Sequence, residues 1–187
     1  MSFQCPQSTS CGRLVIELYS QETPKTCENF KCLITGSKGI MKKAPKKPLH
    51  YLESPIHRIV KGWIAQTGDI TRFDGSGGES IYGGKFNDEK EGLKRSFQKG
   101  SVAMANSGKN SNTSQFFICL SNDTEKMAKM LNGKYVVFGK VVEEYNSKGE
   151  KVANSVVLDA IDIFGSDSGE PIRKLFISKC DVVEKIK

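Results

Sequence analysis

The chain lacks the features that mark membrane, secreted or metal-dependent proteins. No stretch approaches the apolar length that spans a bilayer, and residues 1–6 have neither the basic nor the apolar segment of a secretion signal. The six cysteines form no Cys-x-x-Cys pair and have no histidines at zinc spacing; they are Cys5, Cys11, Cys27, Cys32, Cys119 and Cys180. We therefore expect a cytoplasmic protein, or alternatively a nuclear one, with reduced structural thiols, no metal and no cofactor.

Signatures of common hydrolases and nucleotide-binding proteins are also missing. The chain has only two histidines, His50 and His57, and neither lies in a hydrolase motif. The glycine-dense segment 74–84 lacks the Lys-Ser/Thr pair that follows a phosphate-binding loop. These absences argue against hydrolysis and against phosphate binding.

The composition that is present favours one domain rich in β-structure. A chain of 187 residues can bury most of its apolar surface in a single core, so we expect one domain over residues 1–187. Its apolar and charged fractions, 37% and 26%, are those of globular proteins. The 18 glycines, together with Val, Ile, Phe and Thr spread along the chain, favour short strands joined by turns.

Local patterns place the expected elements. Residues 13–19 alternate like a strand, and a helix is expected over 25–35, with Gly36 as its stop. Two strand pieces lie within 56–69, and further strands are expected at 101–106, 114–120, 135–142 and 173–180, with helices at 125–131 and 156–163. Residues 37–54 show neither the alternation of a strand nor the repeat of a helix, and so they predict a long surface loop. The set indicates a barrel or sandwich with helical caps.

The net charge of +7 is concentrated in part in that loop, through Lys38, Lys42, Lys43, Lys46 and Lys47. We interpret the run as a solvated loop, because no aromatic residues interleave with the lysines to stack on bases, and nucleic-acid binding is disfavoured. The alternative is that the lysines dock an acidic protein or RNA, with the rest of the domain as scaffold.

One arginine interrupts an apolar run over residues 56–60. Strand alternation would place Arg58 on the same side as Ile56 and Val60. Either the stem of Arg58 packs on the sheet while its guanidinium reaches solvent, or the charge belongs to a site. The residues alone leave both interpretations open.

Residues 114–120 predict a strand with two different faces. Gln115, Phe117 and Cys119 share one face, and Phe116, Ile118 and Leu120 share the other. The first face combines an amide with an aromatic ring, which suits a site that grips an apolar group and hydrogen-bonds a peptide backbone. Phe117 could equally be a core residue, and spacing does not decide between the two.

Several segments taken together resemble the cyclophilin family, in the order in which the family has them. They are residues 23–30 (TPKTCENF), 57–60 (HRIV), 66–69 (QTGD), 77–83 (GGESIYG), 104–106 (MAN), 112–118 (NTSQFFI) and 136–141 (VVFGKV). The resemblance covers about residues 12–180. It implies a mainly β fold, an eight-stranded antiparallel closed β-barrel capped by two α-helices, with an external groove that binds X-Pro peptides, and it implies peptidyl-prolyl cis-trans isomerase activity.

The resemblance also implies roles for individual residues. Arg58 matches the family's catalytic arginine. The groove positions correspond to His57, Trp63, Ile64, Gln66, Gly75, Ala105, Asn106, Ser107, Gln115, Phe117, Met130, Leu131 and Tyr135. We expect a monomer that acts on X-Pro-containing peptides and proteins. The alternative is a catalytically weak module that only holds Pro-containing partners.

This sequence departs from the family pattern at three places in or near the groove. Trp63 and Ile64 stand where the family usually has Phe and Met, and they remain apolar. Met130 stands where many members have a tryptophan whose N–H contacts cyclosporin, so we expect weakened cyclosporin binding with isomerisation retained.

The loop over residues 42–51, with Glu79 and Cys180, resembles the divergent loop of one cyclophilin subgroup. The subgroup's partner cysteine falls elsewhere than Cys32. Cys32 and Cys180 are therefore either two inert thiols, which we favour, or a redox pair.

Overall fold

The computed structural model describes residues 1–4, 10–42, 46–153 and 155–183. Cys5 and Lys43 lie outside the described residues. The strands are β1 (Ser2–Gln4), β2 (Ser10–Leu18), β3 (Arg58–Val60), β4 (Ile64–Thr67), β5 (Ser101–Met104), β6 (Phe116–Cys119), β7 (Val137–Tyr145), β8 (Lys151–Val152) and β9 (Phe176–Lys179). The helices are α1 (Pro24–Thr35), α2 (Lys90–Lys94), α3 (Thr124–Leu131) and α4 (Val156–Asp162).

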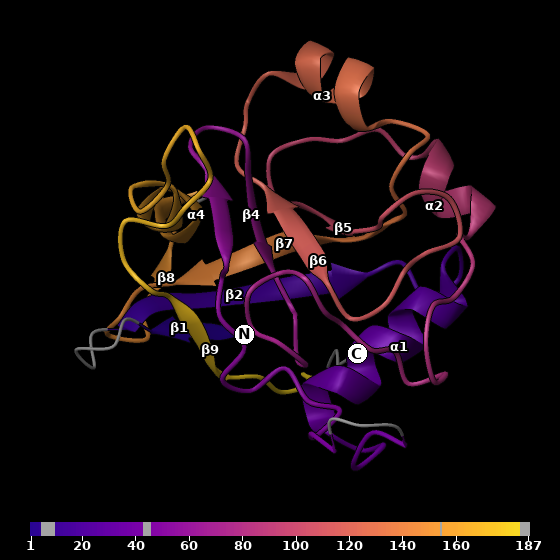
Figure 1. The fold of residues 1–187 in the computed structure, drawn as a ribbon. Coiled ribbons are helices and arrows are strands. Elements are labelled where there is room, and N and C mark those ends of the chain that lie inside the picture. The colour runs from indigo at the N-terminus through magenta and orange to yellow at the C-terminus, as the bar shows by residue number, and fades with distance from the viewer. Residues whose placement is uncertain (5–9, 43–45, 154, 184–187) are drawn as a thin grey trace.

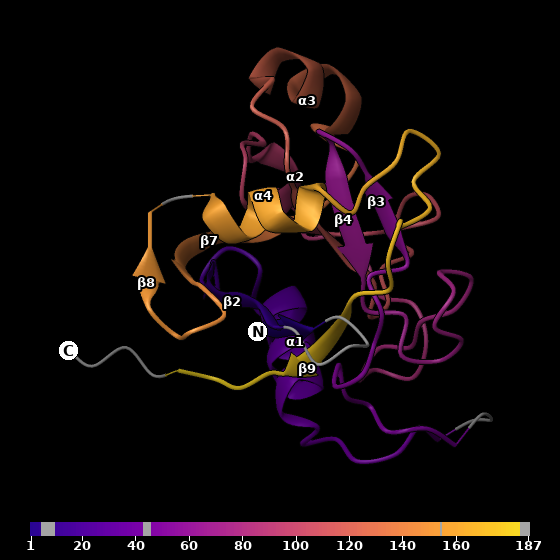
Figure 2. The same cartoon turned by 90° about the vertical axis from the view of Figure 1, so that its left-hand side faces the viewer.

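These strands form one antiparallel sheet in the order β3-β4-β6-β5-β7-β2-β1-β9, with β8 paired to β7 off this path. The described residues therefore contain nine strands and four helices, where the family resemblance implied eight strands and two capping helices. In both views α1 and α3 lie at opposite ends of the molecule, while α4 lies at the side of the sheet (Figures 1 and 2). The mainly β, antiparallel fold with helical caps is confirmed.

The strand ladder does not close, so the expected closed barrel is not confirmed. The two ends of the ladder are β3 and β9. The segment before β3 approaches β9, because Glu53 N donates to Ile177 O at 2.8 Å and Ile56 N donates to Leu175 O at 2.8 Å. Pro55 lies between these donors and has no N–H of its own, and it makes only a single bridge to Phe176. Irregular backbone therefore spans the place where a barrel ladder would continue.

The interior contains two hydrophobic clusters on the two faces of β6. Phe116 and Ile118 belong to the larger cluster, and Phe117 and Cys119 belong to the smaller one. The alternation predicted over 114–120 is thereby confirmed. In the larger cluster the ring of Phe30 from α1 lies 5.1 Å from the ring of Phe116, centroid to centroid.

Helix α1 begins and ends close to the predicted positions. Pro24 occupies the first turn, and Gly36 ends the helix with φ of +66°, a conformation that glycine adopts without strain. The N–H groups at the start of the helix are capped by a side chain that is distant in the sequence. The carboxylate of Glu89 accepts from the N–H of Lys25 at 3.0 Å and from the N–H of Thr26 at 2.8 Å.

The lysine-rich segment is a loop with little regular structure, as predicted. Lys47 fastens it to the neighbouring loop, because its Nζ donates to Thr71 O at 2.6 Å and lies 4.1 Å from the centroid of the Phe73 ring. Lys46 Nζ donates to the carbonyl of Lys42 at 2.7 Å. Some of the lysines are thus engaged within the protein. Among the helices described, none combines the length and the apolar character needed to cross a bilayer.

Candidate functional site

The hairpin of β3 and β4 sets the position of Arg58. Arg58 is paired with Gln66 across the hairpin, and Gln66 is paired in turn with Phe117 on β6. Arg58 is exposed while its neighbour Ile59 is fully buried in the larger cluster. The expected alignment with Ile56 is wrong: Ile56 is buried in the same cluster as Ile59, because the strand begins only at Arg58 and the alternation does not extend back to residue 56.

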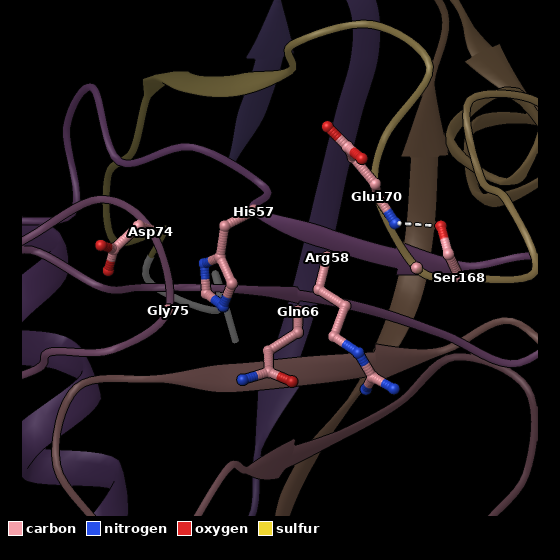
Figure 3. A pocket seen from close by; sticks show the side chains of 8 residues that line it. His57, Arg58, Gln66, Asp74, Gly75, Ser168 and Glu170 are labelled. Atoms are coloured by element: carbon pink, nitrogen blue, oxygen red, sulfur yellow. Dashed lines mark hydrogen bonds between the residues drawn. The ribbon is translucent and has the colours of Figure 1, made fainter.

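A pocket of about 310 Å³ opens beside Arg58. It is lined by His57, Arg58, Gln66, Asp74, Gly75, Ser168, Gly169 and Glu170 (Figure 3). Four of these residues were predicted: His57, Arg58, Gln66 and Gly75. The other four are Asp74 in loop 69–78 and Ser168, Gly169 and Glu170 in loop 165–170, and none of them had a predicted role. Nothing in the sequence connects residues 165–170 with Arg58.

Asp69 organises loop 69–78 from the inside. Its side chain is fully buried, and Oδ1 accepts from the N–H groups of Thr71 and Arg72 while Oδ2 accepts from those of Gly75 at 2.9 Å and Gly77 at 3.0 Å. Burial alone would raise the pKa of Asp69, but the N–H donors outweigh it and lower the pKa to about 2. The loop is therefore wrapped around an ionised carboxylate.

A row of amides connects this loop with the strand that faces Arg58. Gln115 Nε2 donates to the carbonyls of Gly75 at 2.8 Å and Gly77 at 2.6 Å. Gln66 Nε2 then donates to Gln115 Oε1 at 2.8 Å. Gly75 is required here, because its φ is +90° and an added Cβ would lie 2.6 Å from the ring of His57. The predicted residues Gln66, Gly75 and Gln115 thus form one connected polar wall.

His57 is a largely buried imidazole in the same pocket. Burial lowers its pKa, and the carboxylates of Asp69 and Asp74 only partly oppose this, so the ring is neutral at pH 7. Gln115 and the Pro55 carbonyl lie close enough to favour the protonated ring. Neither ring nitrogen makes a hydrogen bond of normal geometry within the part of the chain that the structure describes. Both nitrogens are buried, so the imidazole helps to form the wall of the pocket and does not present a donor or acceptor at its surface.

Aromatic and aliphatic side chains form the other half of the site. The ring of Phe117 stacks on Phe97 at 6.0 Å and meets the edge of Tyr135 at 5.3 Å. Around them lie the remaining members of the smaller cluster that we had predicted, namely Trp63, Ile64, Ala105 and Leu131. Phe117 is 2% exposed, so it is a buried residue and at the same time the base of this apolar surface.

Three predicted groove residues lie outside the pocket, the polar wall and the smaller cluster. Asn106 donates through Nδ2 to the carbonyl of Lys134 at 2.8 Å, and Ser107 is exposed with its Oγ 3.3 Å from Lys85 Nζ. Met130 is 51% exposed on α3. The structure thus brings most of the predicted site together and leaves these three at its margin.

The two cysteines of the possible redox pair are not joined. Cys32 Sγ donates to Glu28 Oε1 at 3.3 Å, and Cys180 Sγ donates to the carbonyl of Ile34 at 3.2 Å. Burial raises the pKa of both thiols, that of Cys180 to about 11, so both are poor nucleophiles at pH 7. No group of three or more His, Cys, Asp and Glu side chains in the described ranges is arranged to hold a metal ion.

The fold and the site define a class of protein. It is an antiparallel β protein whose outer surface carries an exposed guanidinium, a row of amides and an aromatic cluster, and such a surface suits an extended peptide. Comparison with known proteins then identifies the family. The model of the family "Cyclophilin type peptidyl-prolyl cis-trans isomerase/CLD" matches residues 6–182. The chain belongs to the cyclophilin-type peptidyl-prolyl cis-trans isomerase family.

A curated relative agrees with this assignment. The chain is 46% identical over 176 residues to the protein named "Peptidyl-prolyl cis-trans isomerase 9" of Caenorhabditis elegans. The alignment covers 94% of this chain and 52% of the relative, so the chain spans about half the length of that protein. The resemblance inferred from the ordered motifs is confirmed.

Proposed function

We propose that this protein catalyses cis-trans isomerisation of X-Pro peptide bonds, with Arg58 as the catalytic residue. The observation that carries the proposal is the position of Arg58, an exposed guanidinium that lines the pocket and is paired through Gln66 with the strand that carries Phe117. Family membership supports the same activity. The uncatalysed isomerisation is slow, because its barrier is about 18–20 kcal/mol and exchange takes on the order of tens to hundreds of seconds.

The proposed chemistry needs no covalent intermediate. When the X-Pro bond twists, the prolyl nitrogen loses its conjugation with the carbonyl and its lone pair becomes able to accept a hydrogen bond. The guanidinium of Arg58 donates to that nitrogen. The hydrogen bond exists only in the twisted state, so it lowers the barrier without tightening binding of the planar substrate.

The rest of the site would hold the peptide while one side of the bond turns. Ile64, Phe117 and Leu131 supply the apolar surface for the proline ring, and their shared cluster supports this role. Gln66 and the backbone of Asn106 would fix the peptide backbone. Holding one side reduces the reaction to rotation of the other side, which is an entropic advantage.

The direct test is exchange NMR, or a protease-coupled assay, on a short X-Pro peptide. Arg58→Ala should reduce kcat by about 10²-fold or more, in the range measured for loss of one transition-state donor, while changing peptide affinity little. Arg58→Lys keeps the charge but not the planar donor and should recover only part of the rate. Wild-type turnover in Arg58→Ala would end the assignment to Arg58. If the wild type itself gives no acceleration, the groove is a binding site only.

We further propose that cyclosporin binds weakly. Met130 is exposed on α3, and its thioether has no N–H to donate. Met130→Trp should restore a donor and lower the inhibitory concentration of cyclosporin by about tenfold, the equivalent of one net hydrogen bond, with isomerisation of a test peptide unchanged. Nanomolar inhibition of the unmodified protein in a dose series would contradict the proposal.

A further inference from the structure

Loop 165–170, which connects α4 with β9, lies along the strand that carries Arg58. Ile59 N donates to the carbonyl of Gly169 at 2.8 Å, and Ser166 N donates to the carbonyl of Ile59 at 3.1 Å. Lys61 N donates in turn to the carbonyl of Ser166 at 3.2 Å. The loop therefore acts as an irregular partner for the outer edge of β3.

The loop is also held by its own hydrogen bonds. Ser166 Oγ donates to the carbonyl of Glu170 at 2.8 Å and lies 2.9 Å from Ser168 Oγ. Glu170 N donates to Ser168 Oγ at 3.3 Å, the dashed line in Figure 3. Gly169 N donates to the carbonyl of Ser166 at 3.2 Å, which closes a turn in which Gly169 has φ of +87°. The backbone at Gly169 is thus fixed from both sides.

Gly169 lies close against the side chain of Arg58. A Cβ added at Gly169 would lie 3.1 Å from Arg58 Cγ and 3.1 Å from Arg58 Nε, and 3.3 Å from Val60 Cγ2. Within the residues described, the guanidinium of Arg58 takes part in no hydrogen bond or ion pair, so no direct polar contact orients it. The aliphatic stem of Arg58 packs between the strand and Gly169, and this packing sets the direction of the guanidinium.

We propose that Gly169 is a positioning residue for the catalytic arginine: its bare backbone lets loop 165–170 pack against the stem of Arg58 and aim the guanidinium into the pocket. The inference rests on the proposed function, because aim matters only if Arg58 donates to the substrate. A side chain at residue 169 would push Cγ and Nε by a few tenths of an ångström, and the guanidinium beyond them would move further. Catalytic groups tolerate about 0.5 Å of displacement, and about 1 Å can cost 10²-fold in rate.

The chain offers a matched control for this substitution. Gly149 has φ of +82°, and a Cβ added there would meet no atom within 4 Å. Gly149→Ala and Gly169→Ala therefore carry the same backbone strain, but only the second contacts Arg58. We expect similar downward shifts in thermal midpoint for both variants. Gly169→Ala should lower kcat by about three- to tenfold with peptide affinity within about twofold, whereas Gly149→Ala should keep wild-type kinetics.

Two further measurements separate positioning from general damage. In an Arg58→Ala background, Gly169→Ala should cause no further loss of rate, because the residue that it acts through is gone. In the free protein, the ¹⁵N signal of Arg58 Nε should shift in Gly169→Ala and not in Gly149→Ala. An additive loss in the double variant, or an unmoved Nε signal, overturns the inference. An inactive wild type would instead overturn the proposed function. The ¹⁵N signal of Arg58 Nε would still decide whether Gly169 orients Arg58.

Discussion

At the scale of single residues, the properties of the site depend on buried groups behind it more than on the side chains that face the pocket. Asp69 does not line the pocket itself, yet its carboxylate holds Gly75 and Gly77, whose carbonyls accept hydrogen bonds from Gln115. Gln115 then fixes Gln66. The polar wall is thus only as well ordered as the ionised carboxylate beneath it.

We expect Asp69→Asn to destabilise the protein in a pH-dependent way. The folded pKa, about 2, lies below the ordinary value of 3.8, so the carboxylate stabilises the fold above about pH 4, and the contribution is lost as pH falls through about 2. The difference of somewhat less than two pKa units corresponds to about 2 kcal/mol. In urea unfolding the variant should be less stable by about this amount at pH 7, and the difference should shrink towards pH 2.

Asp74→Asn is the control for this prediction. Asp74 lies in the same loop but is exposed, and among the described residues it accepts hydrogen bonds only from Ser76. Its replacement should therefore leave the unfolding midpoint nearly unchanged. A stability difference between wild type and Asp69→Asn that is constant with pH would show that the charge of Asp69 is not what stabilises the loop.

The site residues that sequence alone could place are those that break a local pattern or belong to the ordered motifs. Arg58 interrupts an apolar run, and Gln115 shares a strand face with Phe117, so both were visible. Ser168, Gly169 and Glu170 follow no pattern, because they reach the pocket through the path of a loop more than a hundred residues from Arg58. Contacts of that kind are set by tertiary packing and leave no local signal.

At the scale of elements, α1 shows how far local signals extend. Pro24 and Gly36 marked its ends in the sequence, whereas its N-terminal cap, Glu89, could not be foreseen. The short elements β1, α2 and β8 were also missed. Each has five residues or fewer and depends on a neighbouring strand or loop. Segments of this length are too short to show a recognisable hydrophobic repeat.

Replacing the distant cap should destabilise α1. In Glu89→Ala the N–H groups of Lys25 and Thr26 lose their acceptor, and so does Thr26 Oγ1, which donates to the same carboxylate at 2.7 Å. Loss of a cap costs about 1–2 kcal/mol, and loss of a negative charge at a helix N-terminus adds to it. Urea unfolding should show this decrease with an unchanged m-value.

Glu91→Ala provides the comparison for Glu89→Ala. Glu91 makes only an exposed ion pair with Lys94, and such pairs contribute between about 0 and 1 kcal/mol. Equal effects from the two variants would mean that the carboxylate of Glu89 does not cap α1 in solution.

At the scale of the whole molecule, the site and the main core cannot form independently. A single strand, β6, sends Phe116 into the larger cluster and Phe117 into the cluster beneath the site. The first and last strands of the chain, β1 and β9, are neighbours in the same sheet. A disturbance at β9 should therefore reach the site through the sheet as a loss of global stability, without any contact between the two.

The single tryptophan allows this coupling to be measured. Trp63 packs against the cluster beneath the site, so its fluorescence reports that cluster, while far-UV circular dichroism reports the whole sheet. Ile177 is fully buried on β9 in the larger cluster, and Ile177→Ala should cost about 2–5 kcal/mol through the cavity that it leaves. If the two clusters are one cooperative unit, both signals should move together to lower denaturant in the variant and coincide in each protein. A strand shared by two clusters cannot lose one of its faces and keep the other. A fluorescence transition that stays in place while the dichroism moves would therefore contradict the coupling and would mean that the site folds as a separate unit.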